Sequence, residues 1–194
     1  MTTSPVERSV LTMTQAPQTV GETVRADPMI RAAGGFAIAS GIVSTAGVAF
    51  LITMFALFAA RNTALGQTFG LLNDISAVVQ YLLAIPIALA LHRILLPYSN
   101  PALIRLATVV GIASMMWVVA LQLALVFRVL TFEQQAGWVS LAIFVGVGSW
   151  LVITGLVARS TGRLPNSVVM SAVAVPYLGY PIWAFWLGRR LLSW

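Results

Sequence analysis

The sequence contains no cysteine and no lysine, and each absence excludes a class of chemistry. Without cysteine this chain can form no internal disulfide, thiolate metal site, iron–sulfur cluster or thiol redox centre. Without lysine it can form no retinal or pyridoxal Schiff base, and no P-loop lysine can contact a phosphate. All eleven basic residues are therefore arginines.

Charged residues are also scarce, at 8% of the chain against 59% hydrophobic residues, with a mean hydropathy of +0.93. A soluble domain carries about a quarter charged residues, so this chain has too few polar side chains to cover a surface in water. We therefore expect the lipid bilayer to be its main partner. The sequence predicts an all-α integral membrane bundle of about five transmembrane helices, placed in a bacterial cytoplasmic (inner) membrane.

The net charge of +6 does not indicate a nucleic-acid partner. The arginines are scattered along the chain and stand at the ends of apolar runs, which is where membrane proteins place them. We accordingly predict no nucleic-acid binding.

The apolar pattern divides the chain into a polar tail and a bundle. Residues 1–30 predict a flexible cytoplasmic N-terminal tail, and residues 31–194 predict the transmembrane bundle. The stretch 61–72 contains glycine and threonine and is expected to be a connection, while Pro86 is expected to kink the second span. The five spans are expected at about 34–60, 75–96, 102–130, 137–158 and 167–188.

The arginines also predict an orientation, because cytoplasmic loops carry an excess of them. Five spans would place seven arginines on the side of the tail and four on the other side. The N-terminus is thus expected in the cytoplasm and the C-terminus outside. The tail side would carry Arg8, Arg25, Arg31, Arg93, Arg105, Arg159 and Arg163, and the other side Arg61, Arg128, Arg189 and Arg190.

Small residues recur at helical spacing, as in Ala37, Gly41 and Thr45 of the first span, and in Gly148 and Gly155 of the fourth. Such spacing lets two helix backbones approach closely in lipid. Packing within the bundle is favoured over contact with another subunit.

An acid and the only histidine mark the two ends of the second span. Asp74 and His92 are eighteen residues apart, or five helical turns, so they share one face with Tyr81 between them. Asp74 is expected near a helix end, where it would cap the helix or pair with Arg61 or Arg128. The alternative is a proton-handling or ligand-binding role.

Gln122 is the deepest strongly polar side chain in the third span, and a buried amide in lipid needs a partner on a neighbouring helix. If a polar cavity exists, Asp74, Tyr81 and Gln122 are the residues expected to form it.

His92 is the candidate ligand for a heme or chlorophyll-type pigment. The adjacent Arg93 places it at the membrane surface, where bonding to a headgroup or a backbone carbonyl is favoured. No cluster of metal-ligating residues recurs at ligand spacing, so no metal site is predicted. Ser149 has no second histidine to act as its base, and we predict no enzyme activity.

Two stretches resemble a known kind of protein. The sequence IALALHRILLPYSNPALIRLATVVGIA joins two spans through a short turn, and YPIWAFWLGRRLL closes the chain. Both are similar to small bacterial polytopic membrane proteins catalogued only as a domain of unknown function. The resemblance implies a multi-span fold and no particular activity.

Two functions remain open from the sequence. The first is a non-enzymatic accessory or structural subunit that packs against other membrane subunits, with lipid or pigment in the grooves between them. The second is a small membrane sensor or transporter with a polar cavity around Asp74.

Overall fold

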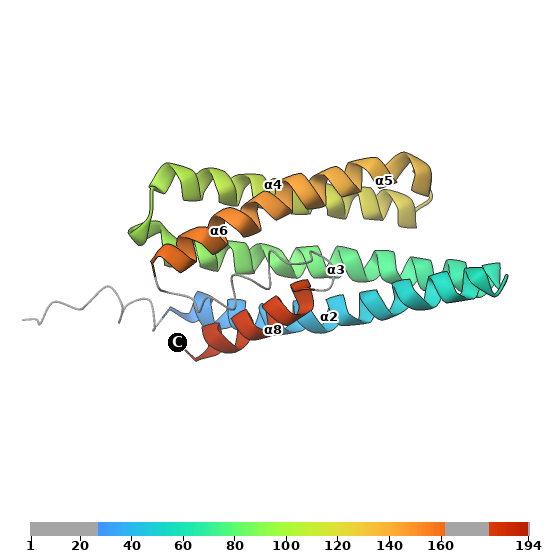
Figure 1. Cartoon of the computed structure of the whole chain (residues 1–194), viewed down its shortest axis with the longest axis horizontal. Coiled ribbons are helices and arrows are strands. Elements are labelled where there is room, and N and C mark those ends of the chain that lie inside the picture. Colours follow the sequence, from blue (N-terminus) through green and yellow to red (C-terminus); the bar gives the residue numbers. More distant parts are fainter. Residues whose placement is uncertain (1–26, 162–178, 194) are drawn as a thin grey trace, which may run out of the picture.

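Two long helical hairpins lie side by side and form the body of the molecule (Figure 1). The computed structural model describes residues 27–161 and 179–193, and these are helices joined by short turns, which confirms the all-α prediction. In chain order the elements are α2 (Pro28–Ala59), α3 (Thr63–Leu95), the 3-10 turn η1 (Leu96–Tyr98), α4 (Pro101–Val126), α5 (Phe132–Leu141), the π-helix η2 (Ala142–Val147), α6 (Gly148–Ser160) and α8 (Gly179–Leu192).

Four segments are long and apolar enough to cross a membrane, which makes this a multi-pass membrane protein by the length and composition of its helices. The first hairpin pairs α2 with α3, and the second pairs α4 with the continuous run of α5, η2 and α6. The four candidate spans are Pro28–Ala59, Thr63–Tyr98, Pro101–Val126 and Phe132–Ser160.

Each hairpin begins with a side-chain N-cap followed by a proline. We call the end of the bundle where α2 and α4 start the proximal end. Asp27 accepts a hydrogen bond from the backbone N–H of Met29 at 2.8 Å, and Asn100 accepts one from Ala102 at 2.9 Å. A proline follows each cap, where its missing N–H costs no hydrogen bond and its fixed φ suits the first helical turn. The sequence therefore specifies both helix starts locally.

The two turns at the opposite, distal end also share one geometry. Arg61 and Arg128 have φ of 58° and 59°, the left-handed conformation that ends a helix. In the first turn the N–H of Asn62 reaches the carbonyl of Leu57 at 2.9 Å, and in the second Val129 reaches Ala124 at 2.8 Å. An arginine thus occupies the position where glycine is usual, and its charge lies beyond the end of the apolar helix.

The expected connection at 61–72 is wrong, because α3 already begins at Thr63. Asn62 caps the helix by accepting a hydrogen bond from the N–H of Leu65 at 3.3 Å. The glycine that suggested a loop instead makes a close helix contact: a Cβ at Gly66 would meet the ring of Phe58 in α2. The second span is therefore a full turn or more longer than the apolar pattern indicates.

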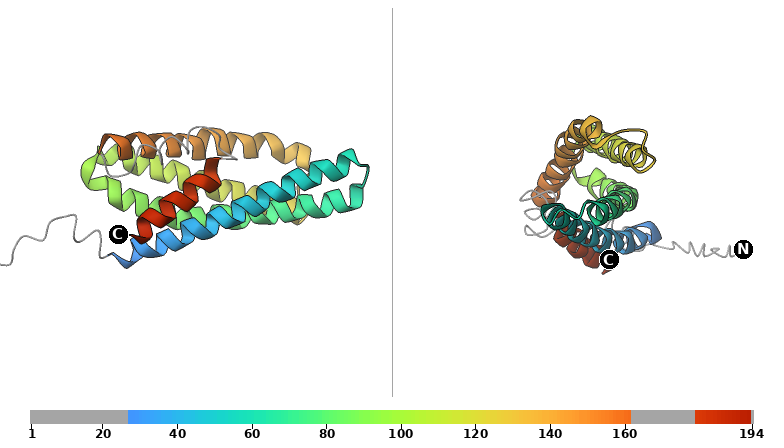
Figure 2. Two further views of the ribbon diagram at one scale, coloured as in Figure 1. Left: turned by 60° about the horizontal axis from the view of Figure 1, so that its bottom comes forward. Right: turned by 90° about the vertical axis from the view of Figure 1, so that its right-hand side faces the viewer.

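The placement of the C-terminus at the opposite end from α2's start is also wrong. Residues 167–178 of the expected fifth span lie outside the described residues, but α8 runs back along α2 toward the proximal end (Figure 2). Tyr180 bonds to Ser40, about 18 Å along α2 from Pro28, whereas Leu192 packs against Gly34. The described C-terminal residues and the start of α2 thus share one end.

Small residues mediate packing within the bundle, as expected, although not always at the residues proposed. Gly41 faces the ring of Phe185 in α8, with 3.1 Å from the position of a Cβ to the nearest ring atom. In the second hairpin the close approach is made by Gly111, against Trp150, and by Gly146, where a Cβ would overlap Ser114. Gly148 faces only its own helix.

Candidate functional site

A cavity of about 60 Å³ lies between the two hairpins. This volume is large enough for water molecules or a ligand of few atoms. Half of its ten lining residues have polar side chains, which is unusual for a protein with so few of them. The lining consists of Ser44, Gly47, Val48 and Leu51 from α2, Asn73, Ala77, Gln80 and Tyr81 from α3, Gln122 from α4 and Ile143 from η2.

The arginines place this cavity at the middle of the spans. On α2, Gly47 stands about halfway between Arg31 and Arg61, and on α3, Ala77 stands halfway between Arg61 and Arg93. In a bilayer bounded by these arginines, the cavity would lie at mid-depth. Sites for transported solutes lie at this depth in many membrane proteins.

Tyr81 and Gln122, which the sequence singles out, both line this cavity from neighbouring helices. The Oε1 of Gln122 accepts a hydrogen bond from the Nε2 of Gln135 in α5 at 2.9 Å. The expected partner for the deep amide is therefore confirmed. Gln122 lines the cavity, and Gln135 holds its amide in place from α5.

Gln135 is the residue that sequence reasoning missed. It is buried, and its Oε1 has no hydrogen-bond partner among the described residues. Its neighbour Gln134 is exposed and completes a capping box with Thr131. The two glutamines differ only in their position on α5. Which of them is buried can be told only once the first residue of α5 is known.

Asp74 lies eleven residues inside α3, about 16 Å from its first residue, because the helix begins at Thr63. The capping role expected from the sequence is therefore wrong, and Asn62 performs it. Pairing with Arg61 or Arg128 is not formed either: within residues 27–161 and 179–193 the one ion pair joins Arg93 to Asp27, at 3.1 Å.

The Asp74 carboxyl does not line the cavity itself, but it contacts a residue that does. It is half-buried and hydrogen-bonds the side chain of Asn73, which does line the cavity. Asp74 also stands one and two helical turns before Ala77 and Tyr81, on the same face of α3. An isolated acid and a polar cavity thus lie one turn apart.

The π-helical stretch η2 brings Ile143 into the cavity wall. One wide turn changes which side chains face inward, and such turns occur often at functional sites. Phe144, the next residue, is exposed. Nothing in the apolar run of this span indicates the irregular turn.

His92 lies on the face of α3 that packs against α4, near the proximal end. Its Nδ1 is 3.1 Å from the hydroxyl of Thr108, which already donates its proton to the carbonyl of Ile104 at 2.8 Å. With the hydroxyl proton of Thr108 already donated, Nδ1–H of His92 is assigned as the donor in this hydrogen bond. The pigment-ligand hypothesis for His92 stays a prediction, and no group of three metal-ligating side chains forms among the described residues.

The chemistry available at the cavity is hydrogen bonding from amides and hydroxyls, with one carboxyl a turn away. The lining holds donors and acceptors at once, through Asn73, Gln80 and Gln122, so it suits a small polar solute or water. No protein-family model, curated protein or solved structure matches this chain.

Proposed function

We propose that this protein is a small carrier or sensor of the bacterial inner membrane, in which a polar solute enters the mid-depth cavity and Asp74 exchanges a proton or binds a cation. The proposal is supported above all by the position of Asp74. It lies inside a candidate span, one turn from a polar cavity, and forms no ion pair within the described residues.

The energetic reason is that an acid within hydrocarbon is expensive. An aspartate at a helix centre costs about 2.5 to 3.5 kcal/mol on insertion scales, and a structural role would offset this cost with a paired cation. Within the described residues, the Asp74 carboxyl hydrogen-bonds the side chain of Asn73 and has no cation paired with it. A carboxyl in this position lowers its free energy by binding a proton or a cation. This binding could couple proton or cation movement to the solute in the cavity.

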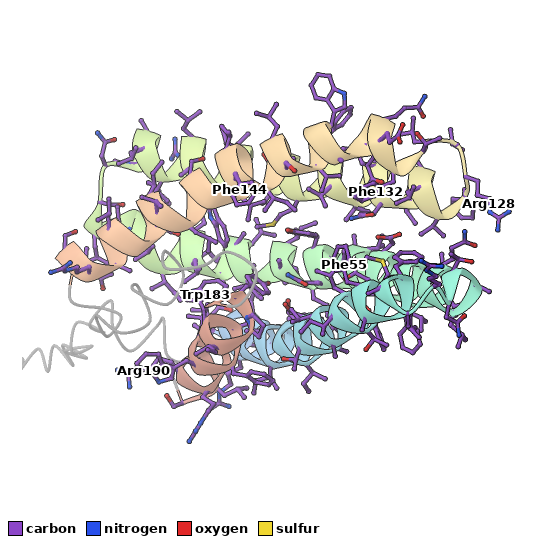
Figure 3. The ribbon with its side chains drawn as sticks, turned by 45° about the vertical axis from the view of Figure 1, so that its right-hand side comes forward. Phe55, Arg128, Phe132, Phe144, Trp183 and Arg190 are labelled. Atoms are coloured by element: carbon purple, nitrogen blue, oxygen red, sulfur yellow. The ribbon has the colours of Figure 1, made fainter. Side chains whose placement is uncertain are left out.

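The orientation that we propose has the proximal end in the cytoplasm. Among the described residues the proximal end carries six arginines and the distal end two, because α8 returns Arg189 and Arg190 to the proximal end. Figure 3 shows Arg128 and Arg190 at opposite ends of the bundle. Both the start of α2 and the C-terminal residues would then face the cytoplasm.

The test is proton movement into proteoliposomes that contain the purified protein and a trapped pH-sensitive dye. A potassium gradient with valinomycin supplies the driving potential. We expect the wild type to acidify or alkalinise the lumen faster than protein-free vesicles, and Asp74→Asn to abolish the difference while leaving reconstitution unchanged.

The matched control is Asp27→Asn, which makes the same chemical change at the proximal end. Asparagine caps a helix as well as aspartate does, so this variant should fold and conduct as the wild type does. Equal rates for the wild type and Asp74→Asn, or equal losses in both variants, would contradict the role of Asp74.

A second function, the accessory subunit expected from the sequence, is favoured by α2. Only 11% of its most apolar window is buried inside the bundle, against 39%, 33% and 44% for the other three spans. A helix whose apolar surface is mostly exposed is suited to packing against another membrane subunit. After gentle solubilisation, a mass equal to one chain with no copurifying protein would contradict this function.

A further inference from the structure

The contact between α2 and α8 brings the backbones that carry three arginines close together near the proximal end. The backbones of α2 and α8 touch near the proximal end, where a Cβ at Gly188 would lie 2.8 Å from the carbonyl oxygen of Gly34. Arg31 precedes Gly34 by one helical turn, and Arg189 and Arg190 directly follow Gly188. We call Arg31, Arg189 and Arg190 the proximal arginine cluster.

The proximal arginine cluster has no counter-charge within the part of the chain that the structure describes. All three residues are exposed, and Asp27, the acid of the described residues at this end, already binds Arg93 at 3.1 Å. Asp27 caps the start of α2, and the first turn of this helix contains no further acid that could pair with Arg31. A bound anion would balance the positive charge of the cluster.

The depth of the cluster identifies that anion. Each of these arginines borders a long apolar stretch, so the cluster stands where the helices leave hydrocarbon, at the level of the lipid headgroups. Trp186, partly exposed one turn before Arg190, is typical of the same boundary. Guanidinium groups bind phosphate through two parallel hydrogen bonds, which favours a lipid phosphate.

We propose that the proximal arginine cluster is a binding site for the headgroup of an anionic phospholipid in the leaflet on the proximal side. The site is assembled by tertiary structure, because it needs α8 to return along α2. It is independent of the cavity and of any transport function.

The experiment is a lipid competition on the full-length protein in mixed micelles. Phosphatidylglycerol and phosphatidylcholine with identical acyl chains are supplied in equal amounts, and native mass spectrometry counts the lipids that stay bound. The wild type should retain phosphatidylglycerol preferentially. Arg189→Gln/Arg190→Gln should weaken that retention about 25-fold, because each basic side chain near an anionic surface contributes roughly fivefold.

Three comparisons make the result specific. Arg61→Gln/Arg128→Gln removes the same charge from the distal end and should keep the preference. Arg189→Lys/Arg190→Lys should keep only the part of it that depends on charge, because lysine cannot form the two parallel hydrogen bonds of a guanidinium group. Arg31→Gln tests the cluster from α2 alone and should weaken retention without altering α8.

Equal retention of the two lipids by the wild type, or equal losses in the proximal and distal variants, would overturn the proposal. Displacement of the lipid by millimolar inorganic phosphate would show that the cluster binds free phosphate as well, and would overturn its assignment to a lipid headgroup.

Discussion

The two aspartates Asp27 and Asp74 differ in their position on the helix and in their partners. Asp27 lies at the proximal end, accepts a hydrogen bond from Met29 and binds Arg93, so its charge stabilises the start of α2. Asp74 lies eleven residues inside α3 and has neither a helix terminus nor an arginine beside it. The contribution of Asp27 to stability explains why an acid stands at that position. Asp74 makes no such contribution, and we attribute its presence to function.

Replacing Asp74 by leucine should therefore stabilise the protein. We expect Asp74→Leu to raise the free energy of unfolding by roughly 1 to 3 kcal/mol, because the cost of an acid in hydrocarbon is removed. Unfolding by titration with sodium dodecyl sulfate, followed by circular dichroism, measures this change. A loss of stability would show that Asp74 has a structural partner and would weaken its proposed role.

The glutamine pair at the cavity makes a prediction of its own. Gln122→Leu and Gln135→Leu should each destabilise the bundle by roughly 1 to 3 kcal/mol, because each leaves a buried amide without its partner. The double variant should cost less than the sum of the two, with a coupling of about 0.6 to 1.7 kcal/mol. Strictly additive losses in a double-mutant cycle would mean that the bond contributes nothing.

At the scale of the helix, glycine acts in this chain as a contact residue. Gly34 and Gly188 let α2 and α8 touch, and Gly111 makes room for Trp150. The same property misled the sequence analysis at 61–72, because a glycine that packs against a neighbouring helix cannot be distinguished locally from one that ends a helix. The partner helix decides which of the two applies.

The adjacent glycines 34 and 35 provide a matched test of this contact. Gly34→Ala should destabilise the protein by roughly 1 to 3 kcal/mol, because its Cβ would lie 3.0 Å from both the carbonyl oxygen of Gly188 and the amide of Leu192. A Cβ at Gly35 meets nothing within 4 Å, so Gly35→Ala should gain up to about 1 kcal/mol from helix propensity. Thermal unfolding in detergent compares the two, and equal effects would argue against the α2 and α8 contact.

At the scale of the whole molecule, the direction of α8 decides which side of the membrane holds the C-terminal residues. Five crossings would separate them from the start of α2, whereas the return of α8 along α2 keeps both at the proximal end. The absence of native cysteine makes this difference directly measurable, because any introduced cysteine is the only thiol in the chain.

Single cysteines at the two ends should label on opposite sides of the membrane. Thr63→Cys at the distal end should react with a membrane-impermeant maleimide in intact cells, and Ser193→Cys at the proximal end should react only after lysis. Both residues are exposed, and both changes are small. Labelling of both positions in intact cells would restore the five-crossing topology.

The sequence by itself determined the solvent, the helical class and the ends of several helices, because hydropathy, Asx-Pro starts and arginine stops act locally. It also identified Tyr81 and Gln122 as residues that could meet. Tertiary structure alone decided that Asp74 lies inside a helix, that Gln135 binds the cavity residue Gln122 and that the last helix runs back along the first. These three outcomes depend on contacts between segments far apart in the chain, and such contacts follow from the packing of whole helices, which no local pattern of residues contains.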